Sequence, residues 1–164
     1  MNNSVSAQTQ TERTVIESFD KEFARLHARS CALIKTTPAE ILYEAPRAKT
    51  GIASKSVGEY VLKSAGAVEQ TFGGITANLW DDPFEWTLPE TLSTRDRVIE
   101  YLTEVEETRK QAFDRFSGDT DLLKKIAVPS GDMRPLIHVF LDTLVRALGY
   151  QGRAVAILGI LSNV

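Results

Sequence analysis

The sequence is poor in the residues that build metal centres and covalent cross-links. Its 164 residues contain one cysteine, Cys31, and two histidines, His27 and His138. A single cysteine cannot form an internal disulfide, which is typical of a protein from a reducing cytoplasm. His27 and Cys31 would share a helix face, but two ligands from one helix are too few for a structural metal site. We therefore expect His27 to be a partly buried residue beside a small apolar thiol.

The chain also lacks a basic excess and a long apolar run. The 19 Lys and Arg residues against 22 Asp and Glu give a net charge of −3, so we do not expect the concentrated basic face that binds nucleic acid. No uninterrupted apolar run reaches the roughly 18 residues that cross a bilayer, and the first residues lack the apolar core of a signal peptide. We expect a cytoplasmic protein with no nucleic-acid or membrane partner.

Length and composition predict a single domain. Hydrophobic residues make up 43% and charged residues 25% of the chain, which is ordinary for a globular protein. A chain of 164 residues also leaves little room for a second core. Residues 1–10 are polar and aperiodic, so we expect a disordered tail there. Residues 11–164 are expected to form one domain.

Four segments carry the apolar spacing of long helices. Apolar residues recur every three or four positions in each of them. The helix starts predicted by this spacing and by capping residues are Thr11, Ser56, Ser93 or Thr94, and Asp132. Strand signals are almost absent, so the pattern predicts an all-α protein, a four-helix bundle with long connections.

Local signals refine two of these helices. Ser56 and Glu59 fit a capping box at the start of the second helix. Asp132 is expected to cap the last helix, with Pro135 tolerated in its first turn. The predicted core face of the last helix consists of Leu136, Ile137, Phe140, Leu141, Leu144, Val145 and Leu148.

Glycines and aromatic residues mark the region between the second and third helices. Gly66, Gly73 and Gly74 lower the helix propensity of the second helix, but they also allow a neighbouring helix or a ligand to come close. The connection Trp80–Pro89 holds two Trp, one Phe and two Pro, and such long connections are often functional. We expect its aromatic residues to cover one end of the bundle; the alternative is a surface that docks a partner.

Four polar residues form a ridge on the last helix. His138, Asp142, Arg146 and Tyr150 follow one another at intervals of four, so they lie on one slowly drifting line along the helix. The apolar face flanks this line, which places the four residues at the margin of the core. One interpretation is a boundary stripe with an Asp142–Arg146 ion pair; the other is a binding site.

The segments TPAEILYEAP (37–46) and SVGEYVLKSAGAVEQTFGGI (56–75), with the order of the long helices, resemble the DinB-like superfamily of metalloenzymes. The resemblance extends over residues 11–161. In that superfamily a histidine of the second helix, in a pattern like V-G-E-L-L-x-H-L-A, joins two histidines of the last helix, in a pattern like H-x-x-x-H-R-G-Q. The resemblance implies a site for a divalent metal, often zinc or nickel, with one position open for water or substrate.

The chain departs from this pattern at all three histidines. When the chain is aligned by this resemblance, YQGR at 150–153 takes the place of H-R-G-Q, so Tyr150 stands at one ligand position. Arg146 stands at the other position in the last helix. Lys63 stands at the position in the second helix, or Ser64 if the register shifts by one residue.

These substitutions favour a site without metal. Protonated Lys and Arg cannot ligate a metal, and Tyr is a poor ligand unless it loses its proton. We therefore predict no metal and no other cofactor, and a polar cluster of Lys63, Asp142, Arg146 and Tyr150 in place of the metal. Either Asp142 or a bound anion would hold the two cations together. The candidate binding residues are Lys63, Ser64, His138, Asp142, Arg146 and Tyr150.

Two classes of function follow from this cluster. The first is a binding or structural protein without metal, with a second copy of the chain or a small anionic or thiol ligand as the expected partner. The second is a metal- or thiol-dependent transferase or isomerase with a displaced site. Such an enzyme would use His138 or His27 as a ligand, or Lys63 or Tyr150 as acid or base if burial shifts its pKa. Metal content separates the two classes.

Overall fold

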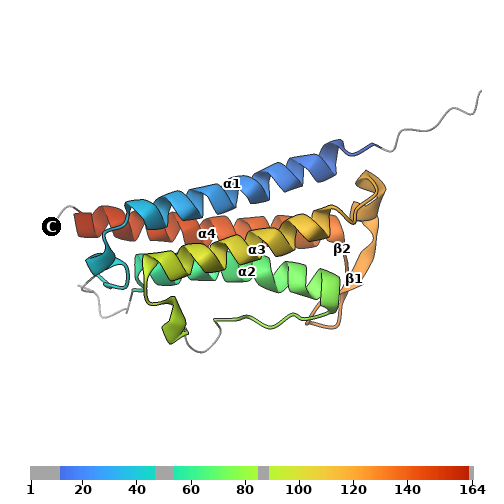
Figure 1. The fold of residues 1–164 in the computed structure, drawn as a ribbon. Coiled ribbons are helices and arrows are strands. Elements are labelled where there is room, and N and C mark those ends of the chain that lie inside the picture. Colours follow the sequence, from blue (N-terminus) through green and yellow to red (C-terminus); the bar gives the residue numbers. More distant parts are fainter. Residues whose placement is uncertain (1–11, 47–53, 85–88, 163–164) are drawn as a thin grey trace, which may run out of the picture.

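Four long helices lie side by side in the computed structural model, which describes residues 12–46, 54–84 and 89–162 (Figure 1). They are α1 (Thr14–Thr36), α2 (Val57–Ala77), α3 (Arg95–Phe113) and α4 (Leu136–Ser162). The short elements are the 3-10 helices η1 (Ala39–Ile41), η2 (Glu90–Leu92) and η3 (Asp119–Leu123), and the strands β1 (Lys125–Ala127) and β2 (Met133–Pro135). The all-α prediction is confirmed. The expected tail at 1–10 and Trp86 lie outside the described residues.

Two kinds of connection set the directions of the helices. A short link through η1 turns the chain back, so α2 runs opposite to α1 (Figure 1). After α2 the chain returns along the side of that helix before α3 begins, so α3 runs in the same direction as α2. The η3 and hairpin segment then turns the chain into α4, which runs in the direction of α1. We call the returning segment, residues 78–84, the crossover.

Capping residues fix where α2 and α3 begin. Ser56 Oγ accepts a hydrogen bond from Glu59 N at 3.2 Å, and Glu59 Oε2 accepts one from Ser56 N at 2.7 Å. The predicted capping box is therefore confirmed. Thr94 caps α3, because its Oγ1 accepts from Arg97 N at 3.3 Å.

The start of α1 is capped by a residue far away in the sequence. The Asp119 carboxylate accepts hydrogen bonds from Ile16 N at 2.9 Å and from Val15 N at 3.0 Å. These bonds satisfy N–H groups that have no partner inside the helix. The helix begins at Thr14, later than the predicted Thr11, where this cap can reach it.

Asp121 holds the same turn together. Its buried carboxylate pairs with Lys124 Nζ at 2.6 Å and accepts a hydrogen bond from Ser117 N at 2.6 Å. These two interactions lower the pKa of Asp121 from its ordinary value. The turn that caps α1 therefore depends on an ionised carboxylate.

The predicted cap at Asp132 is wrong. Asp132 lies between the two strands, where its carboxylate accepts from Ser130 Oγ at 2.8 Å. The strands pair antiparallel with Lys125 opposite Pro135, and α4 begins at Leu136, the next residue. Strands of three residues are too short to show an alternating pattern, so this hairpin left no recognisable signal in the sequence.

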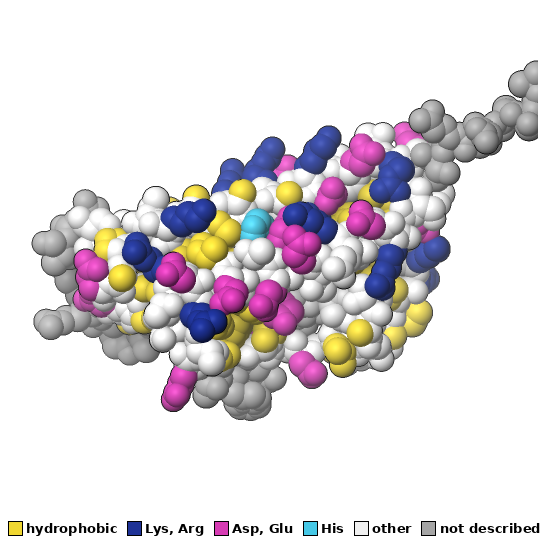
Figure 2. Space-filling model, in the orientation of Figure 1, with side chains coloured by type: hydrophobic (Ala, Val, Ile, Leu, Met, Phe, Trp, Pro, Cys, Tyr) yellow, Lys and Arg dark blue, Asp and Glu magenta, His cyan; other side chains and the backbone are white. Residues whose placement is uncertain are grey.

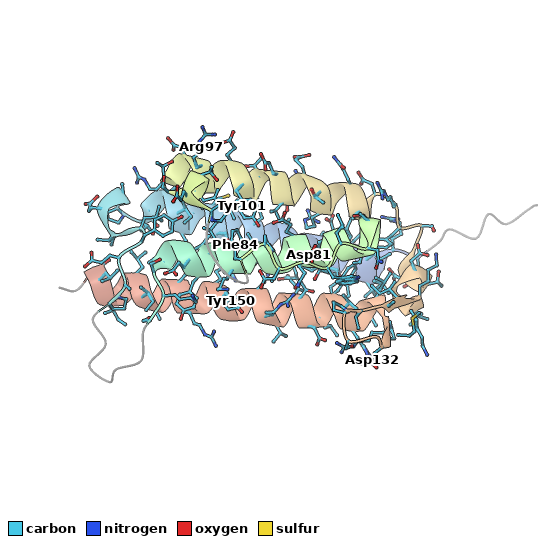
Figure 3. All side chains as sticks on the ribbon, turned by 90° about the horizontal axis from the view of Figure 1, so that it is seen from below. Asp81, Phe84, Arg97, Tyr101, Asp132 and Tyr150 are labelled. Atoms are coloured by element: carbon cyan, nitrogen blue, oxygen red, sulfur yellow. The ribbon has the colours of Figure 1, made fainter. Side chains whose placement is uncertain are left out.

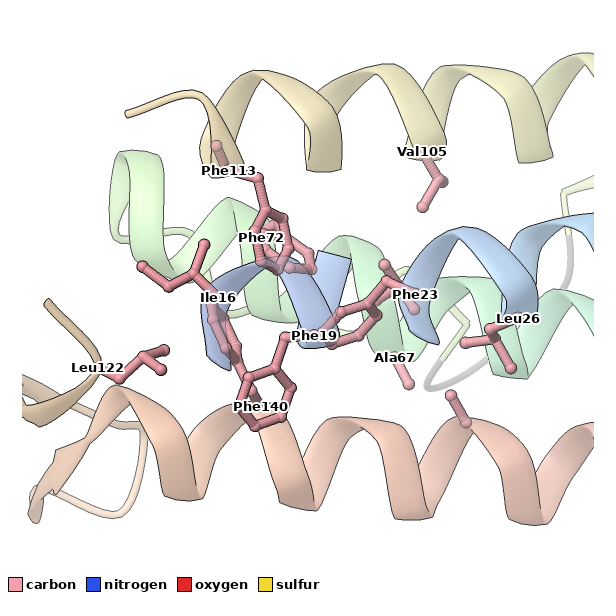
Figure 4. Packing of buried hydrophobic residues seen from close by; sticks show 13 residues of the cluster. Ile16, Phe19, Phe23, Leu26, Ala67, Phe72, Val105, Phe113, Leu122 and Phe140 are labelled. Carbon is pink, nitrogen blue, oxygen red and sulfur yellow. The ribbon is translucent and has the colours of Figure 1, made fainter. Parts of the chain in front are cut away.

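A cluster of phenylalanine rings forms one half of the core (Figure 4). Phe23 of α1 lies 5.2 Å from Phe72 of α2 and 5.8 Å from Phe140 of α4, measured between ring centroids. Both ring pairs meet edge to face, the favoured geometry for aromatic contacts. A second apolar cluster continues the core toward the other end, with Val61 and Leu62 of α2 fully buried.

Arg109 is a buried charge among these apolar residues. It is 2% exposed, and its Nε and Nη2 each donate to the Glu106 carboxylate at 2.8 Å. It also pairs with Asp20 of α1. Burial alone would lower the pKa of Arg109, but the hydrogen bonds to Glu106 and Asp20 outweigh it and raise the pKa. Elsewhere on the face of α1 and α3, acidic and basic side chains are interspersed (Figure 2).

Aromatic residues of the crossover pack against the glycines of α2. A Cβ added to Gly66 would lie 2.8 Å from the ring of Phe84, and one added to Gly74 would collide with Trp80. The segment that closely approaches α2 at these glycines is therefore the crossover, and not the neighbouring helix that was one of the two expectations. Phe84 lies along the side of α2 at Gly66 and not over one end of the helices (Figure 3), so the end-covering prediction is wrong for this residue. Trp80 packs on Gly74, in the last turn of α2.

The predicted core face of α4 is only partly correct. Leu136 and Phe140 are buried, but Leu141, Val145 and Leu148 are exposed. The buried residues of α4 are Leu136, Val139, Phe140, Thr143, Ala147, Gln151, Ala154 and Ile157. Small and polar side chains take part of the inner face because neighbouring helices supply hydrogen-bond partners for them.

Replacing Arg109 by methionine tests the buried ion pair. We expect Arg109→Met to lower the free energy of unfolding by about 3–5 kcal/mol, because Glu106 stays buried without its partner. Arg97→Met is the matched control on the same helix, since the Arg97–Glu100 pair has the same spacing and both side chains are more than half exposed. The control should cost less than about 0.5 kcal/mol. Urea unfolding followed by circular dichroism measures both, and equal effects would contradict the assignment.

Replacing Asp121 by asparagine tests the ionised turn. The folded pKa lies below the unfolded value of about 3.9, so the carboxylate stabilises the fold at neutral pH, and this contribution is lost as the pH falls below about 4. Asp121→Asn should therefore cost about 1–2 kcal/mol at pH 7, with a smaller difference from the wild type at pH 3. The control is Asp114→Asn, at an exposed carboxylate nearby. A pH-independent difference for Asp121→Asn would refute the role.

Candidate functional site

Three of the predicted site residues meet between α2 and α4. A cavity of about 20 Å³ there is lined by Lys63, Ala67, Gln70, Asp82, Arg146 and Tyr150. We call it the Lys63 cavity. The two cations converge on it as expected, but the carboxylate beside them is Asp82 of the crossover and not Asp142 of α4. The segment of chain that follows α2 therefore supplies the negative charge.

The two cations use backbone carbonyl groups as their hydrogen-bond partners. Lys63 Nζ donates to Phe84 O at 3.1 Å. Arg146 Nη2 donates to Ala67 O at 3.5 Å, the upper limit of a hydrogen bond. Neither cation forms an ion pair within the described part of the chain. Arg146 thus keeps most of its donor groups for another partner.

Tyr150 forms the remaining wall of the Lys63 cavity. Figure 3 shows it on the side of α4 that faces α2. Its ring stacks against Tyr60 of α2 with 6.4 Å between centroids, and the guanidinium of Arg153 lies 5.7 Å from its ring centroid. The aromatic and cation contacts fix the ring in place, since both favour a defined orientation.

Asp142 and His138 do not join this cluster. Asp142 Oδ2 pairs with Arg134 Nη1 of the hairpin at 2.6 Å, so the expected Asp142–Arg146 pair is wrong. His138 is exposed in the first turn of α4. The cause is helix geometry: four residues exceed one turn by about 40°, so the ridge moves from solvent at His138 to the α2 side at Tyr150.

Polar contacts hold α2 firmly against α4. The buried Ser64 hydroxyl donates to Ala147 O at 2.9 Å. The hydroxyls of Thr71 and Thr143 lie 2.6 Å apart in the buried interface. Ser64, the alternative candidate for the second-helix position, therefore joins the two helices and does not line the Lys63 cavity.

A larger groove opens beside the Lys63 cavity, between α2, α4 and the hairpin. It has a volume of about 380 Å³, and we call it the α2–α4 groove. Its lining residues are Gln70, Thr71, Trp80, Val128, Pro129, Arg134, Val139, Asp142, Thr143 and Arg146. Gln70 and Arg146 line both spaces. Because Arg134 is already paired with Asp142, the Arg146 guanidinium is the group of this groove that is suited to bind a carboxylate or phosphate.

Sequence reasoning missed several of these lining residues. Arg134 follows a turn, and nothing in its local pattern points to a site. Gln70 donates a hydrogen bond to Trp80 O at 2.7 Å. This bond holds the crossover beside α2, where it forms one wall of the groove. The aromatic composition of the Trp80–Pro89 connection was the one available signal.

His27 and Cys31 contact each other as predicted, with Sγ 3.6 Å from Nε2. His27 lines an internal cavity of about 20 Å³ between α1, α2 and α3, together with Ser64 and Glu106, which has room for about one water molecule. Burial lowers the pKa of His27 and raises the pKa of Cys31. The described residues contain no group of three or more His, Cys, Asp or Glu side chains that could hold a metal ion.

Comparisons with models of known protein families, with curated proteins and with solved structures gave no match. The function must therefore be inferred from the chemistry of the α2–α4 groove and of the Lys63 cavity beside it. Among the described residues, Arg146 is the charged side chain that lines both spaces.

Replacing Arg146 by alanine tests whether its charge supports the fold. The side chain is exposed and forms one long hydrogen bond within the described chain, so Arg146→Ala should change the free energy of unfolding by less than about 0.5 kcal/mol. Ser64→Ala, which removes a buried hydrogen bond between the same two helices, should cost about 1 kcal/mol. Urea unfolding compares them. A loss of several kcal/mol for Arg146→Ala would mean that the guanidinium is structural.

Proposed function

We propose that this chain is a helical-bundle binding protein of DinB-like type without a metal, whose α2–α4 groove takes a small carboxylate or phosphate. The observation that carries the proposal is the position of Arg146. Its guanidinium borders both the groove and the Lys63 cavity, and its one hydrogen bond within the described chain is long. An arginine held in this way gains charge-assisted hydrogen bonds when an anion arrives.

The arrangement of α2 and α4 supports the DinB-like part of the proposal. Lys63, Arg146 and Tyr150 stand where the resemblance places three metal ligands, and all three line one cavity. A common cavity for these three positions is what the resemblance implies, and their shared lining is the observation that supports it. Because Lys63 and Arg146 are cationic, the same position favours an anion over a divalent metal.

The groove also favours one kind of anion. Asp142 already neutralises Arg134 at 2.6 Å, so its carboxylate repels a second negative charge at that end of the groove. Trp80 and Val139 supply apolar surface to the same groove. A ligand with one anionic group on Arg146 and a short apolar body fits this distribution of charge, and a short-chain carboxylic acid is the simplest example.

The alternative is a metal- or thiol-dependent transferase or isomerase with a displaced site. A metal-free enzyme would use Lys63 or Tyr150 as acid or base, whereas a metal-dependent one would need His27 or His138, which lie on α1 and α4. Of the two, His27 lines a cavity of about 20 Å³, which is small for a thiol substrate. This cavity is separate from the α2–α4 groove, so the two functions can be tested separately.

Anion binding is tested by thermal unfolding with acetate, butyrate, benzoate or inorganic phosphate. We expect butyrate or benzoate to raise the melting temperature of the wild type, because a ligand that binds the folded state stabilises it. Arg146→Ala should weaken binding at least about tenfold, equivalent to about 1.4 kcal/mol. Arg25→Ala is the control, since it removes an exposed arginine of α1 that lines neither the groove nor the Lys63 cavity.

Two results would refute the anion site. One is the absence of stabilisation by all four anions; the other is an equal loss of binding in the Arg146 and Arg25 variants, which would indicate non-specific charge effects. The same purified protein is analysed for zinc and nickel by elemental mass spectrometry. About one metal ion per chain, with a clear rise in melting temperature on adding it, would favour the metalloenzyme alternative.

A further inference from the structure

The outer face of α4 carries a row of apolar and small residues. Its members are Leu141, Val145, Leu148, Gly152, Val155 and Gly159. The spacing alternates between four and three residues, so the row runs straight along one side of the helix. The four large members are 48%, 72%, 42% and 55% exposed, in sequence order. We call this row the α4 stripe.

The stripe accounts for the unusual apolarity of α4. By length and composition this helix is apolar enough to cross a membrane, yet 22% of its most apolar window is buried. Part of its apolar surface faces outward, since Leu141, Val145, Leu148 and Val155 are each more than 40% exposed, and a continuous exposed apolar surface marks an interaction site. Leu148, Gly152 and Val155 also line a largely apolar groove of about 550 Å³, whose α1 wall consists of Arg29, Ala32, Leu33 and Thr36.

The glycines of α4 differ from those of α2 in what they contact. Gly66 and Gly74 of α2 are required by packing within the chain, because a Cβ there would collide with the crossover. A Cβ on Gly149 or Gly152 of α4 would meet nothing within 4 Å. Glycine is a poor helix former, and packing inside this chain does not explain its presence at these two positions. At Gly152, which belongs to the stripe, the close approach of a second molecule would explain it.

The sizes of the stripe residues are arranged symmetrically about its centre. When two copies of the stripe are laid antiparallel, Leu148 of each copy faces Gly152 of the other. The same register places Leu141 opposite Gly159 and Val145 opposite Val155. Each leucine thus meets a glycine, and the medium-sized valines meet each other. A two-fold interface requires this kind of self-complementary surface.

We infer that the α4 stripe is the contact surface of a homodimer in which the α4 helices of two copies pack antiparallel. The partner's Leu148 side chain fills the space above Gly152, at the edge of the apolar groove between α1 and α4. The two-fold axis passes between Leu148 and Gly152. This inference does not depend on the proposed anion site, which lies on the α2 side of α4.

The dimensions of the stripe fit a small dimer interface. From Leu141 to Gly159 it is roughly 27 Å long at 1.5 Å per residue. With the flank of α1 included, at a helix spacing of roughly 10 Å, each copy covers roughly 500 Å². This area is at the low end of specific interfaces, so we expect dissociation in the micromolar range.

The charges of α4 lie to one side of the stripe. The stripe itself contains no ionisable residue, whereas Arg146 and Tyr150 line the cavity on the α2 side. Binding at a lipid surface depends on apolar area and on attraction to anionic lipid headgroups, and neither requires the pairing of large with small residues. A second copy of the chain therefore explains more of the pattern than a membrane does.

A charge exchange across the proposed interface tests the register. Val145→Glu and Val155→Lys should each raise the dimer dissociation constant at least about 100-fold, because each places a charge against a valine of the other copy. The double variant should return to within about tenfold of the wild type, since each introduced carboxylate then faces an introduced ammonium group of the other copy. Within one chain the two positions are roughly 15 Å apart along the helix, so the recovery must be intermolecular. Sedimentation equilibrium of the full chain measures all four proteins.

Gly152→Leu tests the contact without risk to the fold. The added side chain meets open space within the chain and leucine favours helix, so the variant should melt no lower than the wild type and yet be monomeric. Gln111→Leu is the control, because it adds the same side chain at an exposed site of α3. This control should remain dimeric.

Three results would overturn the proposal. The first is a wild type that stays monomeric up to about 200 µM, well above the micromolar dissociation expected for this area. The second is a double charge variant that does not recover, which would exclude the antiparallel register. The third is a monomer that floats with vesicles of phosphatidylcholine and phosphatidylglycerol in place of dimerising, which would assign the stripe to a membrane surface.

Discussion

The contact of the crossover with α2 is the constraint on which the site depends. Phe84 and Trp80 lie on the helix where it has no Cβ, and any other residue at Gly66 would lie within 2.8 Å of the Phe84 ring. The Lys63 amine holds the Phe84 carbonyl at 3.1 Å, so both shape and hydrogen bonding fix the segment. As a consequence Asp82 lines the Lys63 cavity and Trp80 lines the α2–α4 groove. Without this contact neither space would have its outer wall.

The second feature that shapes the molecule is the distribution of side chains around α4. Small and polar residues such as Thr143, Ala147 and Gln151 share the inner face with buried apolar residues. Several other apolar residues, Leu141, Val145 and Leu148 among them, face outward. The small inner residues let α2 come close, and Thr143 finds its hydroxyl partner in Thr71 at 2.6 Å. Gln151 donates to Leu26 O of α1 at 3.0 Å. Because these partners satisfy the buried polar groups of α4, part of its inner face consists of small and polar residues in place of large apolar ones.

Features encoded by neighbouring residues could be predicted, and features encoded by distant ones could not. The capping box of Ser56 and Glu59 was found because both halves of the signal lie within one turn. The face of α4 was partly misassigned because apolar residues surround that helix, so their period does not single out one side. Asp142 was paired with the wrong cation because Arg134 belongs to a hairpin whose strands are too short to leave a pattern.

The two proposals place different partners on opposite sides of one helix. Arg146 and Leu148 are two residues apart, and a rotation of about 100° per residue turns them roughly 160° away from each other. A second copy on the α4 stripe would therefore leave the α2–α4 groove open, and neither partner would touch the other. Any influence of anion binding on dimerisation would have to pass through α4 itself, and it would act equally in both directions because coupling between two binding sites is reciprocal. The hydrogen bonds between α2 and α4, from Ser64 to Ala147 and between Thr71 and Thr143, oppose a shift of α4. The geometry therefore favours two partners that bind independently.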